Sequence, residues 1–255
     1  MDTLILKLVL VPVLIGVVSL AGRRWGPAVG GWLAGLPWTS GPVALFLAFE
    51  QGNAFAAQAA QGTLLGLVSV FAFCVVYTRI ARSQGWAVSV LSGWGAFFAA
   101  TLALNRVAIS LIFAFAGVLV AMVATLRFLR AAGPSGTTPV PSVWEIPLRM
   151  LAATAMVLMI TTAAASLGPQ LSGLLTPFPV YATVLAIFTH HFEGAFAASR
   201  LLRGVVIGSL AFAVFFFVLA GTLSAWGLLN AFGLALAAAL VVHGLSFRFL
   251  SAGGG

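Results

Sequence analysis

The sequence predicts an all-α polytopic membrane protein of about nine transmembrane helices, built as an inverted-topology repeat of four, one and four helices. Three observations lead to this class. Of 255 residues, 62% are hydrophobic and only 6% are charged, against roughly 25% charged residues in an average soluble domain. Apolar runs of about twenty residues recur along the chain, with a mean hydropathy of +1.16. Finally, the glycine, proline and tryptophan punctuation of the first half returns in the second half.

This composition excludes a soluble enzyme, a disulfide scaffold and a disordered chain. An outer-membrane barrel is excluded too, because barrel strands alternate apolar and polar residues over about ten positions. Roughly 28 residues per crossing and turn give about nine crossings for this chain length. The nine apolar runs cover residues 4–21, 27–49, 62–77, 86–104, 107–126, 148–167, 169–189, 203–223 and 226–244.

The first run ends at Arg23 and Arg24, which are typical of the flank of a retained crossing rather than of a cleaved signal peptide. A connection rich in glycine, proline, serine and threonine later divides the chain. The predicted units are a first four-helix repeat at 1–104, a linking helix at 105–130, a cytoplasmic loop at 131–147, a second repeat at 148–250 and an unstructured tail at 251–255.

The two halves match in order and in spacing. Chance likeness between apolar segments is the alternative, but colinear glycines and prolines favour duplication. Five predicted crossings separate equivalent helices, an odd number, so the second repeat enters the membrane in the opposite orientation. The matched positions are Gly26-Pro27 with Gly168-Pro169, Ala54-Phe55-Ala56-Ala57 with Ala195-Phe196-Ala197-Ala198, Gly62 and Gly66 with Gly204 and Gly208, and Trp86 with Trp226.

The basic residues give an orientation. If connections alternate between the two sides, Arg106 and Lys7 fall on one face and ten arginines on the other. The positive-inside rule then places the N-terminus outside and the C-terminus in the cytoplasm of a bacterial inner membrane. Scattered arginines are typical of contacts with lipid headgroups and not of nucleic-acid binding. The ten are Arg23, Arg24, Arg79, Arg82, Arg127, Arg130, Arg149, Arg200, Arg203 and Arg248.

The predicted second and seventh helices are interrupted by glycine and proline. Non-helical backbone is costly at membrane depth, so paired interruptions in an inverted repeat indicate a substrate site between them. Half-helices that begin after Pro42 and Pro179 would present free N–H groups to an anion. Proline kinks that serve packing alone are the alternative. The candidate binding residues are Pro37, Thr39, Ser40, Gly41 and Pro42 in the first break, beside Gly35, and Gly173, Thr176, Pro177 and Pro179 in the second.

Ionisable residues follow both breaks. Glu50 comes after the first break, and Glu193 follows the second, with His190 and His191 just before it. Such residues in a membrane protein are candidates for proton coupling; a solvated loop is the alternative. Glu145 is expected in a solvated segment. Because no second ligand cluster and no nucleophile accompany the histidines, we predict no metal site, no cofactor and no enzyme activity.

Two arginines occupy the positions of two glutamines in the repeat. Arg200 and Arg203 correspond to Gln58 and Gln61, and each pair is spaced to share one helix face. Guanidinium groups suit carboxylate and phosphate. We therefore expect Arg200 and Arg203 to form an electrostatic funnel for substrate on the cytoplasmic side, with simple positioning at the membrane surface as the alternative.

The stretch LSGLLTPFPVYATVLAIFTHHFEGAFAASRLLRGVVIG resembles the GlpM-type small bacterial inner-membrane proteins. The first repeat departs from their pattern, with Trp38 to Pro42 in place of the Phe-Pro step and Gln58 in place of the arginine. The resemblance implies a smaller protein that pairs antiparallel, and an association with envelope metabolism but no substrate. The matching positions are Gly173, Leu174, Pro177, Phe178, Pro179, Glu193 and Arg200.

These features predict a secondary transporter or flippase-like carrier for an anionic or amphipathic small substrate, working by alternating access between the two breaks. The alternative is a non-transporting membrane subunit that scaffolds an envelope-biosynthesis complex. Expected partners are membrane lipids and a small or lipid-linked anionic substrate. Nucleic acid is not an expected partner, and a second copy of the chain, forming a homodimer, is a further candidate partner.

Overall fold

The computed structural model describes residues 2–106, 109–129, 144–159 and 178–251, and every regular element in these ranges is a helix. A helical stretch over residues 145–159 lies between α6 and α8. The helices are α1 (Asp2–Trp25), α2 (Pro27–Ala34), α3 (Ser40–Gln51), α4 (Asn53–Ile80), α5 (Trp86–Leu104), α6 (Leu111–Phe128), α8 (Val180–Glu193), α9 (Ala195–Trp226), α10 (Leu228–Ser246) and α11 (Arg248–Ser251).

Five of these helices are long and apolar enough to cross a membrane, namely α4, α5, α6, α9 and α10 with its continuation to Leu250. Their outward faces carry large apolar side chains, as Leu91 on α5, Phe113 on α6 and Leu229 on α10 show. A helix on the surface of a soluble protein presents polar residues there. The all-helical class and a membrane location are therefore supported. Nine crossings are not confirmed, and parts of the predicted fifth, sixth and seventh runs lie outside the described residues.

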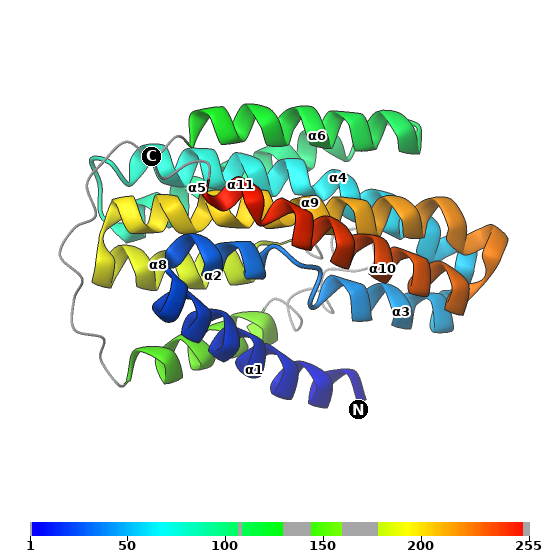
Figure 1. Ribbon diagram of the computed structural model, residues 1–255, viewed down its shortest axis with the longest axis horizontal. Helices are drawn as coiled ribbons and strands as arrows, with labels where there is room; N and C mark the ends of the chain where they lie inside the picture. The colour runs from blue at the N-terminus through cyan, green and yellow to red at the C-terminus, as the bar shows by residue number, and fades with distance from the viewer. Residues whose placement is uncertain (1, 107–108, 130–143, 160–177, 252–255) are drawn as a thin grey trace.

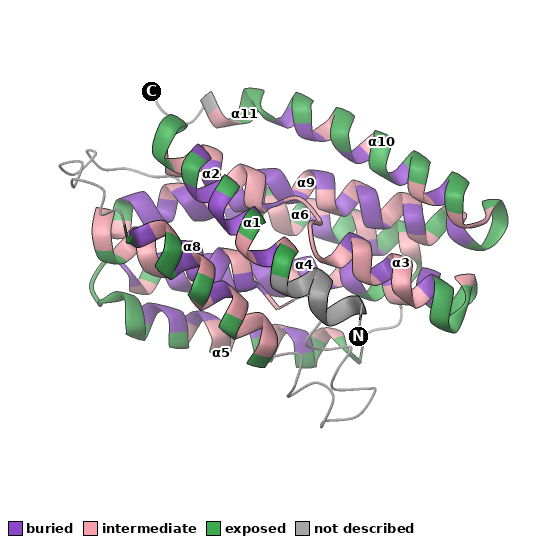
Figure 2. Cartoon of the chain, turned by 90° about the horizontal axis from the view of Figure 1, so that it is seen from below, coloured by how far each residue is buried: buried purple, intermediate pink, exposed green. Residues whose placement is uncertain are grey.

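The two longest spans form the centre of the bundle. In Figure 1, α4 and α9 lie side by side and run in opposite directions. Within its most apolar segment, α9 has 61% of its residues buried and α4 has 44%, whereas α5, α6 and α10 have 28% or less. Figure 2 shows the same distribution, with buried residues gathered along α9 and α4. The remaining helices pack around this antiparallel pair.

The contact between α2 and α9 is made through glycines. A Cβ atom added to Gly31 would lie 1.9 Å from the Leu201 carbonyl oxygen, and one added to Gly204 would lie 2.0 Å from the Ala28 oxygen. The same holds for Gly208, at 2.0 Å from the Trp32 oxygen. Small residues four apart let helix backbones touch, as in membrane helix pairs generally. This contact fixes α2 against the first half of α9.

Four glycines with positive φ each separate two helices by a single residue. They are Gly26, Gly52, Gly194 and Gly227, with φ of 95°, 86°, 89° and 74°. With ψ between 160° and 172°, this is a conformation that other residues rarely adopt. The chain therefore turns sharply into α2, α4, α9 and α10 without a loop.

Two helix starts differ from the sequence prediction for the same reason. We expected apolar runs to begin after Gln61 and at Arg203, but α4 begins at Asn53 and α9 at Ala195. The first turns of both helices mix buried alanines with polar residues. Hydropathy therefore detects these helices late, whereas the glycine before each one sets the true start.

Candidate functional site

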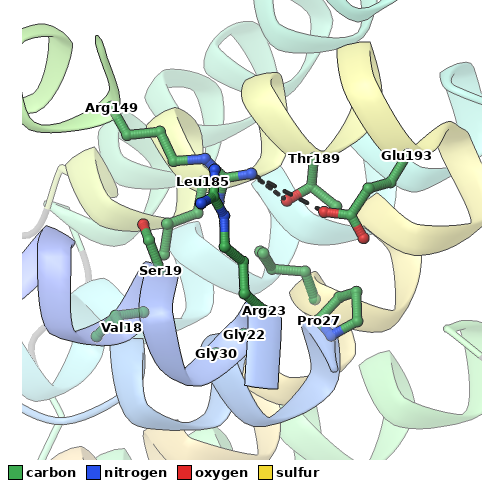
Figure 3. Close-up of a pocket in the computed structure, with 11 residues that line it drawn as sticks. Val18, Ser19, Gly22, Arg23, Pro27, Gly30, Arg149, Leu185, Thr189 and Glu193 are labelled. Atoms are coloured by element: carbon green, nitrogen blue, oxygen red, sulfur yellow. Dashed lines mark hydrogen bonds and ion pairs between the residues drawn. The ribbon is translucent and has the colours of Figure 1, made fainter. Parts of the chain in front are cut away.

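Four charged side chains from three segments meet at one end of the bundle. Arg23 comes from the last turn of α1, Glu145 and Arg149 from the 145–159 helix, and Glu193 from the end of α8. Arg23 Nη2 lies 2.9 Å from Glu145 Oε2, and Arg149 Nη2 donates a hydrogen bond to Glu145 Oε1. Arg149 Nη2 also lies 3.9 Å from Glu193 Oε1 (Figure 3). We refer to these four residues as the charge cluster.

The cluster is buried at its centre and open at one edge. Glu145 and Arg149 are each 5% exposed, whereas the Glu193 side chain is 34% exposed. The Arg149 guanidinium lies 5.7 Å from the centre of the Phe188 ring and 3.5 Å from Thr189 Oγ1. Buried charges persist only when paired. Glu145 and Arg149 meet that condition through their i,i+4 spacing on one helix.

Burial changes the acidity of two members of the cluster, both outside the five candidate spans. It lowers the pKa of the Arg149 guanidinium, an effect that the charge of Glu145 opposes. Burial also raises the pKa of the Glu193 carboxyl, and there the positive charge of Arg149 acts in the opposite direction. Glu193 is therefore a carboxyl group that takes up a proton more readily than an ordinary glutamate.

A small cavity of about 20 Å³ adjoins the cluster, between α1, α2, the 145–159 helix, α8 and α9. Its polar lining consists of Ser19, Arg23, Arg149, Thr189 and Glu193 (Figure 3). Two of these lining residues have a buried polar atom without a hydrogen-bond partner in the described part of the chain, namely Ser19 Oγ and Arg149 Nε. A cavity of this size accepts one or two water-sized groups.

His190 is held by a buried tyrosine of α4. The Tyr77 hydroxyl donates to the Ala186 carbonyl oxygen at 3.1 Å and lies 3.2 Å from His190 Nδ1. The tautomer of His190 decides which group donates in the contact between Tyr77 and His190. His191 is exposed.

The predicted first break lies between α2 and α3. Pro37 and Thr39 are in the connection, and Ser40, Gly41 and Pro42 form the first turn of α3. The helix therefore begins two residues before Pro42 rather than after it, because proline fits the first turn of a helix. In the second break, Pro179 immediately precedes α8. Gly173, Thr176 and Pro177 lie outside the described residues.

The short helices α3 and α8 point in opposite directions. In Figures 1 and 2 their N-terminal ends face the middle of the long axis, while α3 runs toward one end of the bundle and α8 toward the other. Gly52 and Gly194 then return the chain into α4 and α9. As a result Glu50, exposed at the end of α3, lies at the opposite end from Glu193. The structure does not bring these two glutamates together.

Arg200 and Arg203 are the sixth and ninth residues of α9, just after its first turn. Arg203 Nη1 donates to the Leu126 carbonyl oxygen of α6 at 2.9 Å, and Arg200 adds positive charge near Glu193. Gln61, the residue predicted to correspond to Arg203, behaves alike, because its Nε2 donates to the Ile109 oxygen at 2.7 Å just before α6. Both side chains thus bind the ends of one helix.

The sequence prediction missed the centre of the charge cluster. Glu145 was expected in a solvated segment, and this is wrong: it is 5% exposed and both its carboxylate oxygens are paired. Arg23 and Arg149 were interpreted only as orientation signals. The Glu145–Arg149 spacing was a signal for one of these contacts. No local signal exists for Arg23 and Glu145, which are 122 residues apart.

Comparisons with protein-family models, with curated proteins and with solved structures found no match to this chain. The resemblance to the GlpM-type proteins therefore stays a prediction. What the fold and the site define is a helical membrane protein with a buried charge cluster at one end of the bundle.

Proposed function

We propose that this protein is a secondary transporter for a small anionic substrate in a bacterial inner membrane, working by alternating access. The observation that carries the proposal is the opposed arrangement of α3–α4 and α8–α9 (Figure 1). Many carriers consist of two oppositely oriented repeats whose interrupted helices meet near the middle of the membrane. There the N-terminal ends of half-helices attract anionic groups.

The match between the two units supports an inverted repeat. Each unit is a short helix of 12 or 14 residues, one glycine with positive φ, and a long helix of 28 or 32 residues. Gly52 and Gly194 are 142 positions apart (194 − 52), the same spacing as Gly26 and Gly168 (168 − 26). Together with the antiparallel packing of α4 and α9, this regularity favours duplication over chance.

The distribution of arginines supports an orientation with a cytoplasmic C-terminus. Arginines lie at the C-terminal ends of α1, α4 and α6 and in the first turns of α9, all at one end of the bundle (Figure 1). Arg106 follows α5 at the other end. The arginine-rich end, which holds the charge cluster, would face the cytoplasm.

In this proposal the charge cluster closes the cytoplasmic end. Its cavity of about 20 Å³ is smaller than a metabolite, so the described conformation would be closed there. The 3.9 Å contact of Arg149 with Glu193 and the 2.9 Å contact of Arg23 with Glu145 join separate segments, whereas Glu145 and Arg149 share one helix. Opening would separate the first two contacts and keep the third.

Reconstitution into proteoliposomes tests the proposal. Concentration jumps of sodium chloride, formate, succinate and phosphate on a supported membrane would be followed by capacitive current and by a pH dye inside the vesicles. We expect a saturable signal for one class of anion, reduced in Pro42→Ala and Pro179→Ala at normal expression. Arg82→Gln, an exposed arginine at the same end, is the control. No signal for any anion in folded protein, or wild-type signals in both proline variants, would contradict the proposal.

A further inference from the structure

The cavity beside the charge cluster has the donors of an anion site. Ser19, whose Oγ is without a partner among the described residues, is 3% exposed, and Arg149, whose Nε is likewise without one, is 5% exposed. Both residues line the cavity, as do Arg23 and Thr189 (Figure 3). Thr189 Oγ1 accepts from Arg149 and keeps its own proton to donate. Buried polar groups normally have partners, so two unpartnered groups at one cavity indicate a ligand.

Among the four residues of the charge cluster, the charges balance only while Glu193 is ionised, and Arg200 on α9 adds a further positive charge nearby. In the charge cluster, two arginines face two glutamates, which gives no net charge. When Glu193 takes up a proton, the cluster has a charge of +1, and a buried uncompensated charge is costly. One monovalent anion restores neutrality. The same proton removes the negative charge at the cavity lining that would repel the anion.

We infer that this cavity binds one small monovalent anion, either a halide ion or the carboxylate end of a larger molecule, together with one proton on Glu193. Room for one or two water-sized groups suits a halide or a carboxylate and is too small for phosphate or sulfate. This inference rests on the proposed function only for the transport step. There it specifies that the anion moves together with one proton, so that no net charge crosses the membrane.

The groups that act on Glu193 come from every neighbouring segment. Arg149 and Glu145 lie on the 145–159 helix, Arg23 on α1 and Arg200 on α9. On its own helix α8, His190 is engaged with Tyr77 of α4. Burial of Glu193 favours the protonated form, and the three arginines favour the ionised form. The bound anion would shift this balance toward the protonated carboxyl, which is the physical basis of the coupling.

The test measures binding without a membrane gradient. The full-length protein in detergent micelles is titrated with sodium chloride, sodium formate or sodium butyrate by calorimetry and thermal unfolding, with sodium methanesulfonate at equal ionic strength as the bulky control that is neither a halide nor a carboxylate. We expect saturable binding near pH 5 that weakens by up to about tenfold per pH unit above the pKa of Glu193. Calorimetry in buffers of different ionisation enthalpy should give about one proton taken up per anion.

Variants separate the anion site from the proton site. Glu193→Gln mimics the protonated side chain, so we expect it to bind the anion equally at about pH 5 and about pH 8. Ser19→Ala removes a donor without disturbing the ion pairs, and we expect binding weakened by about fivefold to tenfold, the loss of one hydrogen bond. Arg149→Lys keeps the positive charge but has no donor in place of Arg149 Nε, so we expect it too to bind the anion more weakly than the wild type does. Arg82→Gln should bind as the wild type does.

Each outcome decides the inference. Chloride binding alone identifies a halide site, and formate with butyrate identifies a carboxylate site; both support the inference. Binding that is independent of pH in the wild type, or unchanged in Ser19→Ala and Arg149→Lys, overturns it. If none of the probes binds while the proteoliposomes transport an anion, the inference fails and the proposed function stands. If binding is as expected but no anion is transported, the site stands and the proposed function fails.

Discussion

The units α3–α4 and α8–α9 share a backbone but differ in their side chains. Gly52 and Gly194 have nearly the same conformation, with φ of 86° and 89°, and each joins a short helix to a long one. Beside Gly194, Glu193 belongs to the charge cluster. Glu50, two residues before Gly52, is exposed. One backbone arrangement thus serves both ends of the molecule, while the buried ion pairs of the described residues lie at only one of them.

The likeness extends to the helix between the two halves. The linking helix α6 has no counterpart in the predicted repeat, yet each unit donates one hydrogen bond to a carbonyl oxygen in α6 or just before it. Gln61 of α4 binds the Ile109 oxygen before α6, and Arg203 of α9 binds the Leu126 oxygen in its last turn. Gln61 and Arg203, which correspond in the predicted repeat, thus bind opposite ends of α6, as the proposed opposite orientation of the two units requires.

The largest expected difference between the units is at matched glycines. Gly204→Ala places a Cβ 2.0 Å from the Ala28 carbonyl oxygen, so the backbones of α2 and α9 must separate. We expect a loss of about 3 kcal/mol or more in unfolding free energy, or no folded protein. Gly62→Ala, its counterpart on α4, meets nothing within 4 Å and should be neutral or stabilising by up to about 1 kcal/mol. Yield of monodisperse protein and thermal unfolding measure both; equal effects would contradict the packing difference.

The next effect concerns the charge cluster. Arg149→Gln leaves Glu145 buried with Arg23 alone, and removing one partner of a buried ion pair costs about 3–5 kcal/mol. A second change, Glu145→Gln, removes the uncompensated carboxylate and should recover most of that loss. Chemical unfolding in mixed micelles measures the cycle. A double variant no more stable than Arg149→Gln would show that the two side chains do not act as a pair.

Gly52 and Gly194, the two glycines that join a short helix to a long one, should respond alike to substitution. Their φ and ψ place them in a region that other residues adopt at a cost of about 1–3 kcal/mol. Neither Gly52 nor Gly194 has an atom within 4 Å of an added Cβ, so strain acts without a clash. We expect Gly52→Ala and Gly194→Ala to lower the thermal unfolding temperature by similar amounts. Markedly different shifts would mean that the two turns are not equivalent.

Sequence reasoning predicted what depends on local pattern. The helical class follows from composition, and the structure confirms it. The correspondence of Gly62 with Gly204 and of Gln61 with Arg203 is predicted from order and spacing, and the repeat stays a prediction. Sequence reasoning could not predict the turns at Gly52 and Gly194, because these are two of 28 glycines and nothing local marks a positive φ. Only the backbone dihedral angles of the folded chain identify them.

The candidate site was predicted in part for a similar reason. Glu193 was selected because an acidic residue is rare in this chain, and the structure places it in the charge cluster. Arg149 and Arg23 were indistinguishable from the other arginines, since burial and long-range pairing leave no mark in the sequence. An arginine that signals orientation and an arginine that holds a buried carboxylate look the same until the fold is known.

A smaller effect is expected where the units bind α6. Gln61→Ala and Arg203→Ala each remove a hydrogen bond to a backbone carbonyl, worth about 1 kcal/mol for the amide and somewhat more for the guanidinium. Both should loosen α6, and hydrogen exchange at residues 109–112 and 125–128 would localise the change to one end in each variant. Faster exchange at the same end in both variants would contradict the opposed attachment.

The smallest expected effect is the pH dependence of Glu193. Burial raises the pKa of this carboxyl above its ordinary value of 4.5, so the folded protein binds more protons than the unfolded chain between 4.5 and the raised value. The unfolding free energy therefore falls as pH rises through that interval and is constant above it. Glu193→Gln has no carboxyl group at this position, so its unfolding free energy does not fall through this interval. The unfolding temperature of the wild type minus that of the variant should thus decrease as pH rises. The corresponding change in unfolding free energy is less than about 1 kcal/mol because the side chain is partly solvated.

Glu50→Gln is the control for the loss of one carboxylate in the other unit. A difference that grows with pH would mean that the arginines stabilise the ionised carboxylate more than burial penalises it, and the two units would then differ in charge pairing and not in proton uptake.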